Sequence, residues 1–237
     1  MESEYASIEI TLQGREAVIF CPKSETANGH WAFKTEYLRA FPDVQNRLLD
    51  MGYHLAYMKN RTRWGRAEDT DAQAALAAYM HDTLGLSRKG VLIGMSCGGM
   101  QAIYLAAGYP QYVSCLYLDA PVVNFLSCPA ALGASREPMF EEFQNATGMT
   151  LTQLLTYRNH PQDRIPDLIA SRIPVILVCG DSDTVVPYEE NGAILDRMYR
   201  ESGCIIETIV KKGCDHHPHS LEDNTPILSF IQKYDKD

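Results

Sequence analysis

The stretch Gly94-Met95-Ser96-Cys97-Gly98-Gly99 decides how this chain folds. It follows a short apolar run, Gly90-Val91-Leu92-Ile93, which is typical of a buried strand. Apolar residues then recur at helical spacing from Met100 until Gly108. A strand that turns into a helix at Gly-x-Ser-x-Gly is a nucleophile elbow, a strained turn that exposes the serine hydroxyl. The pattern therefore predicts a strand, an elbow and a helix, with Ser96 as the nucleophile.

Cys97 is the rival nucleophile in this stretch, because a thiol is intrinsically more nucleophilic than a hydroxyl. The positions of the glycines decide against it. Gly94 and Gly98 lie two residues on either side of Ser96, whereas Met95 lies two residues before Cys97 and is too bulky for the inner side of the turn. We therefore expect Cys97 to supply its backbone N–H to the oxyanion hole.

A serine nucleophile needs a base and an acid that orients the base, and after an elbow of this kind the acid precedes the histidine in the chain. An apolar run over 173–179 predicts a buried strand, and Asp183 follows its end. Asp183 is the predicted acid, while Asp181 is expected to close the turn. Asp119, which follows the strand after the elbow helix, is an alternative acid, or a residue that orients a loop or a substrate.

Three of the seven histidines crowd into the loop after the next strand, in His216-His217-Pro218-His219. His216, three residues past Gly213, is the predicted general base. We expect His217 and His219 to face the substrate or the solvent. A short His-rich tract can also bind a metal ion, but no second cluster with Cys-x-x-Cys or His-x-x-x-His spacing occurs elsewhere in the chain. The sequence thus predicts no metal and no other cofactor.

With these three positions in place, the whole chain resembles an α/β-hydrolase. The resemblance maps onto Ser96 as nucleophile, Asp183 as acid and His216 as base. It implies a mostly parallel sheet flanked by helices. Four motifs also resemble a bacterial subgroup that often accompanies carbohydrate-degrading enzymes: Cys21-Pro22-Lys23, Trp31-Ala32-Phe33-Lys34-Thr35-Glu36, Asp119-Ala120-Pro121 and His216-His217-Pro218-His219.

One departure from the family concerns the second half of the oxyanion hole. Many members carry His-Gly after the strand that feeds this site, whereas the predicted strand 16–20 ends in Cys21-Pro22-Lys23-Ser24. Pro22 has no N–H, so the donor is expected at Lys23 or Ser24. Trp31 follows this loop and is either a packing anchor or a substrate contact. We assign it, with Asp119 and His217, to the predicted substrate-binding residues.

The chain is long enough for one substantial core, and strands alternate with helices along it, as in a parallel sheet covered on both faces. We predict a single α/β-hydrolase domain over 1–237. About fifty residues separate Asp119 from Ile173, more than a simple crossover needs. Helices are expected at 136–146, 150–158 and 163–171, and residues 122–161 are predicted to form a small helical cap over Ser96. The alternative is a surface elaboration without a role at the site.

Composition limits the partners. The formal charge is −9 without a run of like charges, which argues against nucleic acid and against an acidic membrane surface. The first residues are acidic and no apolar stretch approaches ~18 residues, so neither a signal peptide nor a membrane span is expected. The seven cysteines show no framework spacing and are expected to be free thiols in a reducing, cytoplasmic compartment.

The predicted chemistry is transfer of an acyl group from a small-molecule ester to water through an acyl-serine. The resemblance implies an acylated carbohydrate or another small carboxylic ester with a short acyl group. A lactone, amide or C–C bond hydrolase with the same three residues is one alternative. A non-catalytic, ligand-binding member of the fold is the other.

Overall fold

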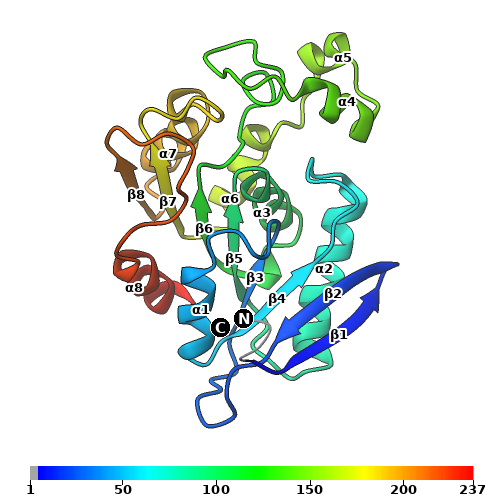
Figure 1. Ribbon diagram of the computed structural model, residues 1–237, viewed down its shortest axis with the longest axis vertical. Helices are drawn as coiled ribbons and strands as arrows, with labels where there is room; N and C mark the ends of the chain where they lie inside the picture. Colours follow the sequence, from blue (N-terminus) through cyan, green and yellow to red (C-terminus); the bar gives the residue numbers. More distant parts are fainter. Residues whose placement is uncertain (1–4, 237) are drawn as a thin grey trace.

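A computed structural model describes residues 5–236, which form an α/β sandwich around one twisted sheet (Figure 1). Within these residues the sheet has eight strands in the order β1-β2-β4-β3-β5-β6-β7-β8. The strands are β1 (Ser7–Leu12), β2 (Arg15–Phe20), β3 (Trp31–Lys34), β4 (His54–Met58), β5 (Gly90–Met95), β6 (Val113–Asp119), β7 (Val175–Gly180) and β8 (Ile206–Lys211). β1 and β2 pair antiparallel and β2 runs antiparallel to β4, while β3 to β8 are parallel. The carboxyl ends of these six parallel strands therefore share one edge, where ligands bind in such sheets.

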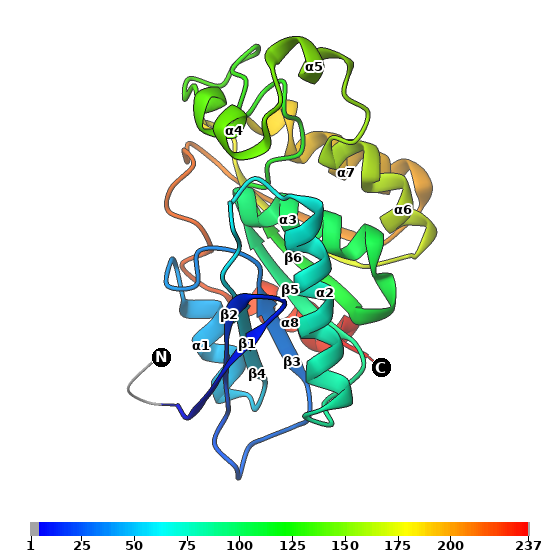
Figure 2. The same cartoon turned by 90° about the vertical axis from the view of Figure 1, so that its right-hand side faces the viewer.

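Helices cover both faces of the sheet (Figure 2). The α-helices are α1 (Asp43–Asp50), α2 (Ala67–Asp82), α3 (Cys97–Gly108), α4 (Phe140–Thr147), α5 (Leu151–Thr156), α6 (Ile165–Ala170), α7 (Gly192–Ser202) and α8 (Thr225–Tyr234). Short 3₁₀ turns are η1 (Pro110–Tyr112), η2 (Pro161–Arg164) and η3 (Tyr188–Glu190). α2, α3, α6 and α7 pack on one face, and α1 and α8 pack on the other. Among the described residues, no helix is both long and apolar enough to cross a membrane.

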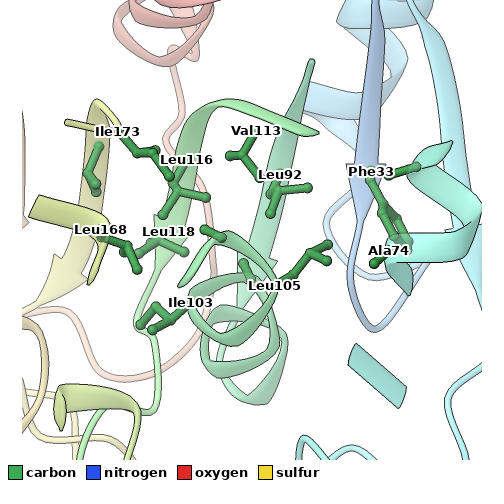
Figure 3. Close-up of a cluster of buried hydrophobic side chains, with 14 of the residues drawn as sticks. Phe33, Ala74, Leu92, Ile103, Leu105, Val113, Leu116, Leu118, Leu168 and Ile173 are labelled. Carbon is green, nitrogen blue, oxygen red and sulfur yellow. The ribbon is translucent and has the colours of Figure 1, made fainter. Parts of the chain in front are cut away.

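Alternation along the central strands divides the core between the two faces. Leu92 of β5 and Leu116 of β6 point toward α3, in the cluster drawn in Figure 3. Their strand neighbours Val91 and Cys115 point to the other face, against α1 and α8. Both sets are fully buried, which explains why these strands are continuous apolar runs in the sequence. The predicted strand–helix alternation and fold class are confirmed by this architecture.

The position of the first hairpin corrects one prediction. The strand 16–20 was expected to feed the oxyanion hole, but β2 lies beyond β4, and β3 is the neighbour of β5. Because β2 is antiparallel to β4, its last residue Phe20 pairs with Leu55 near the start of β4. The loop that follows lies against Gly52, where the N–H of Asn28 donates to the Gly52 carbonyl at 3.1 Å. Residues 21–30 thus occupy the amino end of the parallel strands, opposite the elbow.

The connection between β6 and α6 contains α4 and α5, which lie over the carboxyl ends of the strands (Figures 1 and 2). Helices were expected at 136–146 and 150–158, and the structure has shorter ones that begin at Phe140 and Leu151. The segment 122–161 is therefore placed where a cap would be, and its role as a cap stays a prediction.

Candidate active site

Ser96 lies between β5 and α3 with φ 53° and ψ −120°, a backbone conformation that L-residues rarely adopt. β6 and the residues after it hold the turn: the Ser96 N–H donates to the Asp119 carbonyl at 2.9 Å, and the Val122 N–H donates to the Ser96 carbonyl at 3.1 Å. Gly94 is required here, because a Cβ at this position would lie 2.6 Å from the Gly98 carbonyl oxygen. The strain predicted for the elbow is present at Ser96.

The structure brings the three predicted triad residues together from three strand ends. The imidazole Nε2 of His216 lies 3.1 Å from Ser96 Oγ, and its Nδ1 lies 2.8 Å from Asp183 Oδ2. His216 and Asp183 are buried, with relative exposures of 5% and 6%. Because an ionised carboxylate only accepts hydrogen bonds, Nδ1 carries the proton and Nε2 presents its lone pair to the serine hydroxyl. This arrangement is capable of removing a proton from Ser96.

Asp183 is fixed by its own turn after β7. Its Oδ1 accepts the N–H groups of Val185 and Val186 at 2.9 and 2.7 Å. The neighbouring Asp181 accepts the Gly213 N–H at 2.6 Å, which ties the turn to the histidine loop. Asp183 is therefore the carboxylate aimed at the base, and Asp181 joins two loops.

Cys97 is the first residue of α3, and its side chain points away from solvent with 1% exposure. Burial raises the pKa of the Cys97 thiol to about 11. A thiolate is the nucleophilic form of cysteine, so the environment disfavours Cys97 as the nucleophile near neutral pH. Its backbone N–H directly follows Ser96, the position at which one oxyanion donor is expected.

A second buried imidazole–carboxylate pair adjoins the first. Asp119, the last residue of β6, accepts His219 Nδ1 at 2.8 Å on Oδ1. Its Oδ2 accepts the Tyr117 hydroxyl at 2.8 Å and the Ser220 N–H at 2.6 Å. Burial alone would raise the pKa of Asp119, but the hydrogen bond and charge of His219 hold it below its ordinary value. Asp119 therefore orients the histidine loop, one of the roles expected for it, while His216 Nδ1 is paired with Asp183.

Lys34, at the end of β3, is fully buried behind the elbow. Its Nζ lies 2.9 Å from Met95 Sδ and 3.4 Å from the Ala40 carbonyl. Burial lowers the pKa of Lys34 to about 7, against an opposing effect of Asp119. The sequence predicts no role for Lys34.

The oxyanion donor predicted at Lys23 or Ser24 is wrong. Both residues are exposed in the loop at the amino end of the parallel strands, far along the sheet from Ser96. The strand beside β5 is β3, so the segment that adjoins the elbow begins at Thr35, whose hydroxyl donates to the Gly98 carbonyl at 2.7 Å. Tyr37 follows with φ 55° and lines the cavity that contains Ser96.

A buried polar network fixes this second segment. Glu36 Oε2 accepts Asn60 Nδ2 at 3.0 Å and Gln101 Nε2 at 2.9 Å. Gln101, on α3, is 1% exposed and also accepts from Gln73 at 2.9 Å. The turn at Glu36–Tyr37 is thus tied directly to the elbow helix. The residues Thr35 and Glu36 are part of a motif quoted from the sequence. Their position beside the elbow follows from the pairing of β3 with β5, which the sequence does not predict.

Trp31 does not contact the candidate active site. It is the first residue of β3, is fully buried, and its Nε1 donates to the Ser87 carbonyl at 2.8 Å. Its ring covers Gly90, where a Cβ would lie 2.3 Å from the ring. Since β3 and β5 are parallel, Trp31 lies at the strand starts, and the prediction of a substrate contact is wrong.

The cavity at Ser96 has a volume of about 500 Å³. Its walls combine aromatic, sulfur-containing and polar side chains: Tyr37, Phe41, Arg63, Glu137, Met139, Val185, His217 and His219. His217 is exposed at this opening, in agreement with its expected position. Burial, with the charges of His216 and His219, lowers the pKa of His217 below its ordinary value. Glu137 and Met139 come from the segment 122–161, so this segment contributes to the wall.

Arg63 and Glu142 connect the wall to α4. Arg63 Nε donates to Glu142 Oε1 at 2.8 Å, its Nη2 also contacts Glu142, and Trp64 Nε1 donates to the same Oε1 at 3.0 Å. Arg63 lines the cavity at Ser96, and its neighbour Trp64 lines a second cavity of about 610 Å³. Its lining includes Trp64, Arg66, Tyr104, Tyr109, Phe125, Phe143, Tyr157 and Asn159.

Fold and site together define an α/β-hydrolase fold with a serine–histidine–aspartate constellation at its nucleophile elbow. A sequence profile of the family described as alpha/beta hydrolase fold matches residues 54–152. No curated protein sequence matches the chain.

Solved structures with the same fold cover nearly the whole chain. One is an acylaminoacyl peptidase from Pyrococcus horikoshii, with TM-score 0.76 and 11% identity over 97% of this chain and 42% of that one. Another is a puromycin-hydrolyzing peptidase from Mycobacterium tuberculosis, with TM-score 0.75 and 12% identity over 98% of this chain and 40% of that one. The present chain spans about two fifths of the length of these peptidases.

Est1E from Butyrivibrio proteoclasticus is similar in length as well as in fold. It aligns with TM-score 0.68 and 16% identity over 95% of this chain and 99% of its own. At these identities the likeness concerns the fold alone.

Proposed function

We propose that this protein is a serine hydrolase that cleaves small carboxylic esters through an acyl-enzyme. The observation that supports it is the continuous contact from Ser96 Oγ through His216 to Asp183, at 3.1 and 2.8 Å. In the first step, Ser96 Oγ attacks the ester carbonyl while His216 Nε2 takes its proton, and Asp183 stabilises the imidazolium. His216 then gives this proton to the leaving alcohol. It next activates a water molecule that releases the acid and regenerates Ser96.

The oxyanion hole is proposed to consist of the backbone N–H groups of Cys97 and Tyr37. Cys97 follows the nucleophile at the start of α3. Tyr37 lines the same cavity as Ser96, and its N–H donates a long hydrogen bond of 3.4 Å to Glu36 Oε1. Each donor should lower the barrier by ~3–4 kcal/mol. The network around Glu36 holds the second donor in place, so Glu36→Ala should reduce kcat more than it changes KM.

A short acyl group attached to a carbohydrate is the finer proposal for the substrate. The resemblance to proteins that accompany carbohydrate-degrading enzymes supports it, and so does the second cavity, because aromatic faces beside polar groups suit a sugar ring. The segment 122–161 is proposed to act as the cap that forms both cavities. Tyr157→Ala, at a residue that lines the second cavity rather than the one at Ser96, should raise KM for an acetylated sugar and leave p-nitrophenyl acetate hydrolysis unchanged.

Amide hydrolysis is the second candidate, because two structures of the same fold are peptidases by name. A panel of p-nitrophenyl esters of increasing acyl length, acetylated sugars, lactones and aminoacyl p-nitroanilides separates these candidates. We expect turnover of the short esters and none of the anilides. A non-catalytic ligand-binding protein would turn over none of them and would not react with a fluorophosphonate probe at Ser96.

We further propose that the protein acts in the cytoplasm on a small molecule, without nucleic acid or a membrane as partner. The formal charge of −9 supports this, as do the cysteines, all seven of which are free thiols. Fractionation of the native host cells, followed by detection of the protein, would test the compartment.

A further inference from the structure

Three imidazole rings meet at the mouth of the catalytic cavity, and ester hydrolysis uses only one of them. The ring centroids of His216, His217 and His219 lie 4.8 to 4.9 Å apart in all three pairs. One nitrogen of each ring lies within 4.8 Å of one nitrogen of each of the others. Histidine is the commonest protein ligand of transition metals, so this cluster requires a chemical explanation of its own.

Two of the three rings are prepared for metal binding by the carboxylates behind them. His216 Nδ1 and His219 Nδ1 each lie 2.8 Å from a buried carboxylate, of Asp183 and Asp119 respectively. A proton is thereby held on each Nδ1, and each Nε2 retains a free lone pair. Carboxylate–histidine–metal arrangements of this type fix the ring and increase the basicity of the ligand. The two carboxylates also place negative charge next to the site, which favours a divalent cation.

We propose that His216, His217 and His219 bind a divalent transition-metal ion, with Zn²⁺ as the expected ion, and that the bound ion reversibly blocks the active site. Zn–N bonds of about 2.0–2.1 Å in a tetrahedron require ligand nitrogens about 3.3 Å apart, so the rings must approach one another. His217 is exposed and can move toward the other two rings, whereas any approach between His216 and His219 requires the loop that carries both to move. The fourth ligand is a water molecule or Ser96 Oγ, which already lies 3.1 Å from His216 Nε2.

Inhibition follows from the lone pair that the ion occupies. His216 Nε2 accepts the Ser96 proton during hydrolysis, and a metal bound to the same nitrogen removes this base. The ion is not a cofactor, because the contact from Ser96 to Asp183 is complete without it. Zn²⁺ should therefore inhibit hydrolysis, a chelator should restore it, and a chelator alone should leave the metal-free protein unchanged.

Binding can be measured without activity. We would titrate Ser96→Ala protein with Co²⁺ and follow the visible absorption of the tetrahedral ion, then displace Co²⁺ with Zn²⁺. In this background His217→Ala and His219→Ala should each weaken binding. Asp119→Asn should weaken it about 10–100-fold through the orientation of His219. His81→Ala, an exposed histidine on α2, and Cys214→Ser, a thiol in the same loop, are the matched controls and should not change affinity.

The inhibition is then measured on wild-type protein with a p-nitrophenyl ester. Zn²⁺ binding that is equal in His217→Ala and His81→Ala would overturn the proposed site, as would an octahedral Co²⁺ spectrum. Because His217 is exposed, this variant remains informative even where His219→Ala fails to fold. Tight Zn²⁺ binding without loss of turnover would overturn the blocking role. If no ester is hydrolysed at all, the proposed function fails while the Co²⁺ titration still tests the metal site.

Discussion

The two imidazole–carboxylate pairs of this protein are nearly identical in local geometry. In both, histidine Nδ1 lies 2.8 Å from a buried aspartate. In both, the second carboxylate oxygen accepts two further hydrogen bonds. The pairs differ at Nε2: that of His216 lies 3.1 Å from Ser96 Oγ. The reach of Nε2 to the nucleophile, rather than the quality of the pair, distinguishes a candidate base.

The pairs also differ in where their remaining hydrogen bonds originate. Asp183 takes its two backbone donors from its own turn, at Val185 and Val186. Asp119 takes one donor from its own strand and another from Ser220 in the histidine loop. Its backbone carbonyl also accepts the Ser96 N–H. Asp183 thus serves one ring, whereas Asp119 joins the elbow to the loop that bears the base.

The largest expected effect is that of Ser96→Ala. Loss of the nucleophile should lower kcat by about 10⁶-fold, as in a serine protease, and leave the fold intact because the hydroxyl lies at a cavity. Ester hydrolysis and fluorophosphonate labelling both report this change. If Cys97→Ala abolished turnover instead, the assignment of the nucleophile would be wrong.

The second prediction separates the two pairs. Asp183→Asn should reduce kcat about 10⁴-fold, because it leaves the base in the wrong tautomer. Asp119→Asn should reduce it only about tenfold, equivalent to about 1.4 kcal/mol, by loosening the loop. Steady-state kinetics on one short ester measures both. The reverse ranking would make Asp119 the acid, and equal losses would mean that the two carboxylates act together.

The triad positions were predictable from the sequence because each follows a recognisable strand. The elbow glycines specify Ser96, and the strand over 173–179 and the histidine loop come in the required order. The contact between Asp119 and His219 was not predictable. The two residues are 100 positions apart in the chain and meet because the ends of β6 and β8 lie at the same edge of the sheet. The sequence predicts a different role for each of them, with no contact between them.

The oxyanion loop and Trp31 show where a sequence reading fails. β3 is only four residues long, Trp31-Ala32-Phe33-Lys34, and its apolar run resembles a loop with an anchoring side chain. If β3 is not recognised in the sequence, the strand 16–20 is taken as the neighbour of the elbow strand. Lys23 is then placed at the carboxyl end of the parallel strands, whereas it lies at their amino end. Strand order depends on the antiparallel turn of β2 against β4, which no local pattern reveals.

The third prediction concerns stability. Asp119→Asn replaces one carboxylate oxygen by an NH₂ group, which cannot accept a hydrogen bond. If Oδ1 is replaced, His219 Nδ1 loses its acceptor; if Oδ2 is replaced, the Tyr117 hydroxyl and the Ser220 N–H lose theirs. The expected loss is about 1–3 kcal/mol. The pKa of Asp119 is held below its ordinary value in the folded protein, so this contribution is present at neutral pH and is lost as the pH falls through the folded pKa. Thermal unfolding should show the difference from wild type shrinking in acid; a constant difference would mean that the charge has no part in it.

The last prediction concerns Lys34, the buried amine near Asp119. Burial lowers its pKa to about 7 from 10.5. Above the folded pKa the unfolded chain therefore binds more protons than the folded one, and the free energy of unfolding rises with pH between about 7 and 10.5. Lys34→Met should raise the melting temperature at neutral pH and flatten this rise. Lys59→Met, which changes an exposed lysine, is the control and should do neither. If Lys34→Met instead destabilises the protein and leaves the pH dependence of the free energy of unfolding unchanged, the amine is charged in the folded protein. Lys34 would then stabilise the Asp119 carboxylate together with His219.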